Sequence, residues 1–260
     1  DEAHLFKSKS LTTIMTKLIN CKYRFGMTGT LDGTQTHRLV LEGLFGKVEK
    51  VTSTKELMDK DTLASLKIKC LVLKHKENEC KEVKDLKYSE ELQYIVAHKT
   101  RNDFISRLCD KLNGNTLCLY QLVEKHGLVL YNLMKDFDRK VFFIHGGTDT
   151  ETREKIRAIT EKETNAIIVA SYGTFSTGIN IRNLHNIVFA SPSKSRIRVL
   201  QSLGRGLRRT TMGQLHTTLI DIADDFTYKD KKNFTLNHFL ERINIYNEEE
   251  FDYEIDRIRI

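Results

Sequence analysis

The feature that most constrains the fold is an alternation of short apolar runs with helical stretches in the middle of the chain, from Thr116 to Ile222. The runs are rich in Val, Ile and Leu and too uniformly apolar for a sheet with one wet face, which is typical of strands buried on both sides. Strands that alternate with helices of about ten to fifteen residues predict βαβ units and a parallel sheet. This part of the sequence therefore predicts one complete α/β domain.

The expected elements of this domain follow one another closely along the chain. Each strand is five to seven residues long, and helical stretches separate most of them. Strands are predicted at 116–122, 141–145, 166–171, 186–190 and 216–222, and helices at 124–135, 150–163 and 195–208.

The first 75 residues follow a different pattern. A strand is predicted at 23–28 and another at 66–73, with a glycine-punctuated stretch and a polar helix near 55–66 between them. We interpret this part as the remnant of a second α/β unit, too short to close its own sheet. The expected organisation is this remnant (1–75), a connector rich in lysine and glutamate (76–103), the complete domain (104–225) and a helical tail (226–260).

In the tail, Phe239, Ile243 and Tyr246 are spaced to form one apolar stripe of a helix.

The charge and the cysteines indicate the kind of partner and compartment. The net charge of +7 suits a polyanion such as nucleic acid, although a protein that is merely basic would have the same value. The apolar surroundings of Cys109 and Cys118 predict buried free thiols in a reducing compartment. No apolar run approaches the length of a membrane span, so we expect a cytoplasmic protein without a membrane partner.

Two short segments near the start of the chain could bind a nucleotide. Asp1-Glu2-Ala3-His4 places two carboxylates side by side, of which one can hold a Mg²⁺ shell while the other orients or deprotonates a water. Gly26-Met27-Thr28-Gly29-Thr30 follows the strand predicted at 23–28, where its hydroxyls could hydrogen-bond the carboxylate loop. The alternatives are a chance surface tetrapeptide and an ordinary strand-to-loop turn.

Two later segments complete the set. Residues 170–180 form a loop rich in Gly, Ser and Thr, whose N–H and hydroxyl groups suit phosphate oxygens, although it could be a plain flexible loop. Residues 201–209 contain Arg205 and Arg208, which lie three positions apart and would project from one helix face as a fork for a triphosphate. Gly204 and Gly206 weaken a helix, so a solvated basic helix end is the poorer interpretation.

Together these four segments resemble motifs II, III, V and VI of the superfamily 2 helicases of the DEAH-box type, in that order and spacing, from Asp1 to about Asp225. The resemblance implies two RecA-like lobes, with ATP bound in the cleft between them. Residues 1–75 would be the C-terminal part of the first lobe, and residues 104–225 would be the second lobe.

The resemblance also implies roles for single residues. Asp1 would coordinate Mg²⁺ through water, and Glu2 would be the catalytic base. Coupling of hydrolysis to lobe movement would fall to His4, Thr28, Gly29 and Thr30. On the second lobe, the residues near the nucleotide would be Gln201, Arg205, Arg208, Gly178 and Asn180.

The nucleic-acid contacts are less sharply defined. Many family members carry Thr six residues before the motif V glycine, but here that position is Tyr172 with Ser171 beside it, so either hydroxyl could face the strand. His145-Gly146-Gly147-Thr148 is a second candidate, because Gly-Gly lets the backbone approach a phosphate. Thr148 and Glu151 have the spacing of a capping box, and a plain loop before a helix is the alternative.

The sequence contains no GxxxxGK[ST] phosphate loop, which in this family lies upstream of the DEAH box. Because the chain begins on Asp rather than Met, we expect that the N-terminal half of the polypeptide is missing and that this piece alone does not hydrolyse ATP. The expected whole protein is an ATP-dependent helicase acting on branched DNA or RNA–DNA hybrids in replication, recombination and repair. The alternatives are a translocase subunit of a restriction enzyme and a non-catalytic nucleic-acid-binding module.

Overall fold

The computed structural model describes Ala3 and Ile181 and the ranges 9–28, 35–60, 65–174, 183–192 and 216–260. The chain divides into two compact units, Asp1–Ser53 and Thr54–Ile260. No helix in these ranges is long and apolar enough to cross a bilayer.

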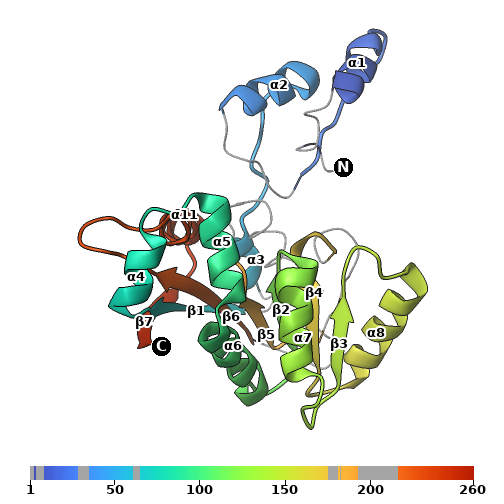
Figure 1. Ribbon diagram of the computed structural model, residues 1–260. Coiled ribbons are helices and arrows are strands. Elements are labelled where there is room, and N and C mark those ends of the chain that lie inside the picture. The colour runs from blue at the N-terminus through green and yellow to red at the C-terminus, as the bar shows by residue number, and fades with distance from the viewer. Residues whose placement is uncertain are drawn as a thin grey trace. The chain divides into compact units, whose positions relative to one another are not determined.

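The described part of the second unit forms one sheet of seven strands, all parallel, in the order β3-β4-β2-β5-β6-β1-β7 (Figure 1). Parallel strands need crossover connections, and helices provide most of them here. The strands are β1 (Ser65–Lys74), β2 (Thr116–Tyr120), β3 (Val141–Ile144), β4 (Ile167–Ser171), β5 (Asn186–Phe189), β6 (His216–Asp225) and β7 (Tyr253–Arg259).

Helices cover both faces of this sheet, as expected for strands that are apolar throughout (Figure 1). Successive residues of β1 point to opposite cores: Val72 lies in one and Leu73 in the other. The described helices of this unit are α3 (Thr54–Asp59), α4 (Glu77–Val83), α5 (Tyr88–Ala97), α6 (Lys99–Lys111), α7 (Leu128–Met134), α8 (Thr150–Lys162) and α11 (Phe234–Glu248), with a π-helical turn, η2 (Val123–Gly127), before α7.

Each core takes side chains from different helices. The Leu73 core contains Ile105 of α6 and Leu130 of α7, whereas the Val72 core contains Ile156 of α8 and Phe239 of α11. These two cores confirm the predicted α/β class, and the strands and helices expected between residues 116 and 171 are all present. The predicted stripe of Phe239, Ile243 and Tyr246 packs into the second of them. The helix expected at 195–208 lies outside the described residues.

The structure corrects the predicted boundaries at three places. The strand expected at 66–73 is β1, which does not belong to the first unit, because it pairs along its length with β6 and β7. The predicted connector (76–103) consists of α4, α5 and the start of α6. The tail is helical only as far as Glu248, and β7 then joins β1 as an edge strand. The first and the third of these differences share one cause, since strand pairing is set by residues far apart in the sequence.

The first unit contains α1 (Lys9–Lys17) and α2 (Gln35–Phe45). The strand predicted at 23–28 is absent: these residues are described but have no regular structure. The apolar side chains of Tyr23, Phe25 and Met27 are exposed, with 79% of Phe25 accessible. A strand requires a neighbour to accept and donate its hydrogen bonds, and the described residues of this unit contain none.

Candidate functional site

The candidate site residues of the second unit lie where parallel strands end. Carboxyl ends of parallel strands meet at one edge of a sheet, where ligands of open α/β sheets usually bind. His145 follows β3, and Ser171 is the last residue of β4, the strand next to it. The structure therefore brings the two predicted nucleic-acid-binding loops to the same edge.

Hydrogen bonds between its own residues hold the first loop, His145–Thr148, in place. The His145 N–H donates to Thr148 Oγ1 at 3.1 Å, and the Gly147 N–H donates to His145 Nδ1 at 3.1 Å. Arg153, on α8, donates to the Gly146 carbonyl at 3.0 Å. Gly146 and Gly147 are exposed, so their backbone is accessible to a ligand.

The helix that follows this loop is capped by a different residue from the one predicted. Asp149 is the N-cap of α8, and its Oδ1 accepts from the Thr152 N–H at 2.8 Å. The same hydrogen bond lowers the pKa of Asp149. Thr148 cannot serve as the cap, because Asp149 has the extended backbone of a cap residue and the Thr148 oxygen accepts from His145 instead. The capping box predicted for Thr148 and Glu151 is therefore wrong.

The second loop distinguishes the two hydroxyls that the sequence left open. Tyr172 is 1% exposed, its hydroxyl donates to the Ser191 carbonyl at 3.0 Å, and its ring packs edge-on against Phe189. Burial raises the pKa of Tyr172 well above its usual value. Ser171 Oγ accepts from the Thr174 N–H at 3.2 Å and lies 2.7 Å from Thr174 Oγ1. The tyrosine hydroxyl is thus engaged deep in the core. Ser171 is also buried, with 9% of its surface exposed, and its hydroxyl bonds to Thr174 at the strand end, so Ser171 stays a prediction as the nucleic-acid contact.

Ser191, which the sequence analysis did not single out, links several of these elements. Its Oγ accepts from the Gln121 N–H at 3.0 Å and lies 2.7 Å from His126 Nδ1, in the π-helical turn. Burial, helped by the charge of Arg101, lowers the pKa of His126 to about 3. The neutral imidazole, Ser191 and Tyr172 therefore tie the ends of β2, β4 and β5 together. The π-turn itself was the missed signal, since such turns are frequent at functional sites.

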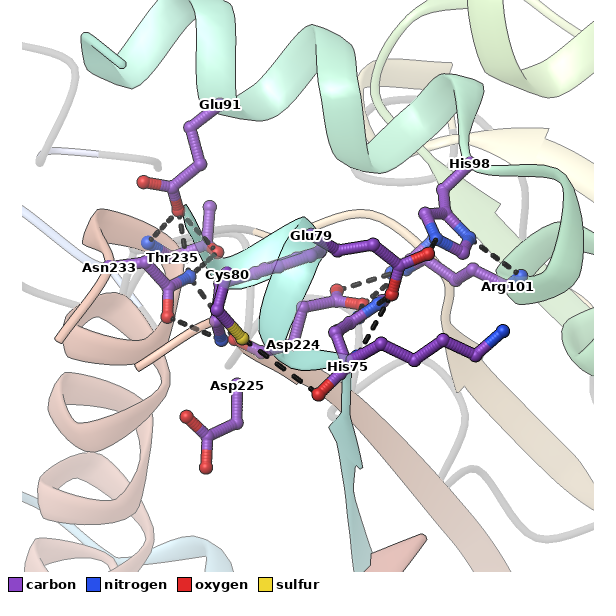
Figure 2. A network of polar contacts seen from close by, with 12 residues as sticks. His75, Glu79, Cys80, Glu91, His98, Arg101, Asp224, Asp225, Asn233 and Thr235 are labelled. Carbon is purple, nitrogen blue, oxygen red and sulfur yellow. Dashed lines mark hydrogen bonds and ion pairs between the residues drawn. The ribbon is translucent and has the colours of Figure 1, made fainter. Parts of the chain in front are cut away.

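A second polar network lies at the ends of β1 and β6 (Figure 2). Arg101 of α6 is completely buried and its Nε donates to both carboxylate oxygens of Asp224, at 2.8 and 2.9 Å. His75 Nε2 lies 3.0 Å from Asp224 Oδ1. Burial raises the pKa of Asp224, but Arg101 and His75 outweigh burial and hold it at about 2.

In the first unit, the structure brings part of the DEAH segment beside the predicted hydroxyl segment. The Ala3 N–H donates to the Met27 carbonyl at 2.9 Å. A Cβ added to Gly26 would lie 2.9 Å from the Phe45 ring and 3.2 Å from Ala3 Cβ, so this position has room only for glycine. Thr28 is half-buried next to this contact. The remaining predicted site residues lie outside the described part of the chain: Asp1, Glu2, His4, Gly29, Thr30, Gly178, Asn180, Gln201, Arg205 and Arg208.

Comparison with known proteins identifies relatives of the whole chain. Residues 99–210 match the family described as helicase conserved C-terminal domain. The ATP-dependent DNA helicase UvsW of Enterobacteria phage T4 is 34% identical, with 100% of this chain and 54% of the relative covered. A putative ATP-dependent RNA helicase of Acanthamoeba polyphaga mimivirus is 24% identical, with coverages of 92% and 46%. The chain thus spans about half the length of these relatives.

Solved structures agree with this result. The crystal structure of T4 UvsW superposes with a TM-score of 0.65 at 33% identity and covers 100% of this chain and 53% of that one. An ATP-dependent Type ISP restriction-modification enzyme bound to DNA has a TM-score of 0.57 at 13% identity, with coverages of 84% and 17%. The second likeness shows the fold alone.

Proposed function

The chain belongs to the superfamily 2 helicases, and we propose that it is part of an ATP-dependent DNA helicase that unwinds or remodels branched DNA or RNA–DNA hybrids in replication, recombination and repair. The observation that carries this proposal is the 34% identity to a phage DNA helicase along the whole chain. We also propose that it acts in the cytoplasm of a bacterial host. The buried free thiols of Cys109 and Cys118 suit that reducing compartment.

The nucleotide chemistry is assigned from the motifs. Asp1 would hold Mg²⁺ through water, since carboxylate oxygens are the hard ligands that this ion prefers. Mg²⁺ supplies charge neutralisation to the ATP phosphates, while Glu2 accepts the proton of the attacking water. Arg205 and Arg208 approach the phosphates, and an arginine that stabilises the transition state contributes roughly 10³–10⁵ in rate. Gln201, Gly178 and Asn180 line the nucleotide.

The coupling to nucleic acid is assigned to the strand-end loops. His145, Gly146, Gly147, Thr148 and Ser171 lie at one edge of the sheet. We assign contacts with the phosphate backbone to these residues. His4, Thr28, Gly29 and Thr30 transmit the state of the nucleotide. The contact between Ala3 and Met27 supports that role, because it links the DEAH segment directly to the hydroxyl segment.

The restriction-translocase alternative gains no support from the structural likenesses. The matched restriction enzymes are 13% and 20% identical to this chain, so they show only that the lobe is shared. A non-catalytic module would have no physical need for Asp1, Glu2 and both arginines.

The proposal is tested in a longer polypeptide that carries a phosphate loop ahead of Asp1. Arg208→Ala removes a transition-state contact without touching the strand-end loops. We expect DNA-stimulated ATP hydrolysis to fall by about 10³-fold or more, with DNA affinity within about twofold of the unsubstituted protein. Hydrolysis is measured by phosphate release and affinity by fluorescence anisotropy. Loss of DNA binding with hydrolysis preserved would contradict the assignment.

A further inference from the structure

Three side chains outside the helicase motifs converge at the end of β1 (Figure 2). His75 follows β1, Glu79 lies on α4 and His98 joins α5 to α6. One possible ligand atom from each lies within 4.8 Å of the other two. Two imidazoles and one carboxylate are a ligand set found in metal sites.

The hydrogen bonds of His75 leave its other nitrogen free for a ligand. His75 Nε2 is 3.0 Å from Asp224, a carboxylate kept ionised by Arg101, so the ring proton sits on Nε2. His75 Nδ1 then carries a lone pair, is buried and has no hydrogen-bond partner. It lies 3.8 Å from Glu79 Oε2, which is too far for a hydrogen bond. A metal ion at this point would give the buried Nδ1 the partner that it lacks.

We propose that His75, Glu79 and His98 form a binding site for a divalent transition-metal ion, and that Zn²⁺ is the ion that fits it best. Zn²⁺ binds His nitrogen and carboxylate oxygen at about 2.0–2.2 Å in tetrahedral geometry, which places the ligand atoms roughly 3.4 Å apart. The observed separations are 3.1 Å from His98 Nε2 to Glu79 Oε1 and 3.8 Å from His75 Nδ1 to Glu79 Oε2, so each histidine faces a different oxygen of the same carboxylate. Binding therefore requires the three ligand atoms, which lie within 4.8 Å of one another, to draw closer together around the ion.

The surroundings of the site support this assignment. Asp224 would orient the metal-bound His75 through its other nitrogen, as carboxylates do in many zinc sites. Phe226 stacks on the His75 ring at 3.7 Å between centroids and fixes its plane. The side chain of Glu79 is 18% exposed, so the cluster is not fully closed off from solvent.

His98 must change one hydrogen bond to bind the ion. Its Nδ1 accepts from the Arg101 N–H at 3.2 Å, as N-cap of α6, so Nε2 carries the proton that is donated to Glu79. When Nε2 binds the ion, the neutral ring carries its proton on Nδ1 instead, so Nδ1 no longer accepts from the Arg101 N–H and the weak N-cap bond is lost. Such a bond contributes about 1 kcal/mol, which is small beside the binding of zinc.

A bound ion would act as a clamp rather than as a reaction centre. It would join the end of β1, α4 and the α5–α6 junction, and, through Asp224 and Arg101, the ends of β5 and β6. Arg101 already reaches the Ala190 carbonyl at 2.7 Å beyond β5. The proposal is independent of ATP hydrolysis and is tested by binding alone.

The test titrates Zn²⁺ into the chain after treatment with a chelator, by calorimetry, and records the visible absorption of a Co²⁺ complex. Glu79→Gln removes the carboxylate but keeps an oxygen for the Lys76 N–H that caps α4. His98→Asn removes the imidazole but keeps a good N-cap. Glu82→Gln, on the same helix, is the matched control. All variants carry Cys21→Ser, because that exposed thiol could bind metal on its own.

We expect one Zn²⁺ per chain, a tetrahedral Co²⁺ spectrum and a higher melting temperature with zinc. Affinity should fall at least about 10-fold in Glu79→Gln and in His98→Asn and stay unchanged in Glu82→Gln. Circular dichroism checks that each variant is folded. Absence of stoichiometric binding, or equal affinity in all variants, would overturn the proposal.

Discussion

The two units of the chain differ in how far they bury their apolar residues. In Thr54–Ile260 the apolar strands pair in parallel and bury both faces under helices. In Asp1–Ser53 the described segments are two helices and irregular stretches, and side chains such as Phe25 are exposed. The difference teaches that an apolar run becomes a strand only when neighbouring strands are available. The described residues of the first unit form no strand.

The largest predicted change in stability that tests this comparison concerns two phenylalanines. Phe189 of β5 is 1% exposed, whereas Phe25 of the first unit is 79% exposed. Phe189→Ala should lower the free energy of unfolding by about 3–5 kcal/mol, because it leaves a cavity in a packed core. Phe25→Ala should change it by no more than about 0.5 kcal/mol. Urea unfolding followed by circular dichroism measures both, since the chain has no tryptophan. Equal costs would show that the first unit has a core of its own.

A second test uses the buried charges of the second unit. The folded pKa of Asp224 is about 2, below its usual value of 3.8. A depressed carboxyl pKa contributes stability that is present above about pH 4 and is lost as the pH falls through 2. We therefore expect the free energy of unfolding to decrease over this interval.

A solvated carboxyl group of the first unit is the control for this acid-unfolding test. Glu42 pairs with Arg38 at 3.0 Å, and this hydrogen bond lowers its pKa, but the pair is solvated. Glu42→Gln should leave the pH dependence of the free energy of unfolding unchanged. Asp224→Asn should lower the free energy of unfolding at neutral pH and remove part of its decrease in acid. Urea titrations at several pH values separate these outcomes. An acid profile that does not change in Asp224→Asn would remove Asp224 as its source.

The smallest effect concerns the corrected helix cap. Asp149→Ala should cost about 1 kcal/mol, because the Thr152 N–H loses its acceptor. Hydrogen exchange at Thr152 should accelerate in Asp149→Ala and stay the same in Thr148→Ala. The reverse pattern would restore Thr148 as the cap.

The sequence predicts where a strand or helix lies better than it predicts which other strands a strand pairs with. The strands of the second unit between 116 and 171 are recognisable because each lies in its own apolar run. The unit to which β1 belongs cannot be recognised from the sequence, because Ser65 pairs with His216, 151 positions later. β7 is an edge strand with mostly exposed side chains, so it lacks a strong apolar pattern.

The same limit applies to the sites. Motif residues are recognised by order and spacing along the chain, so the loop after β4 could be predicted as a candidate, and the Gly-Gly pair indicated the loop after β3. The metal cluster could not, since only His75 and Glu79 are close in sequence, and His98 and Asp224 arrive through the fold. The buried position of Tyr172 likewise depends on a residue distant in sequence, because its hydroxyl donates a hydrogen bond to the carbonyl of Ser191, which follows β5.

ATP hydrolysis tests the central claim most directly, through the comparison between this chain alone and the same chain preceded by a phosphate-loop segment. We expect no DNA-stimulated hydrolysis by the chain alone, because no glycine loop and lysine grip the phosphates. The longer polypeptide should hydrolyse ATP, and Glu2→Gln in it should abolish turnover. Robust hydrolysis by the chain alone that is abolished by Glu2→Gln would contradict the account.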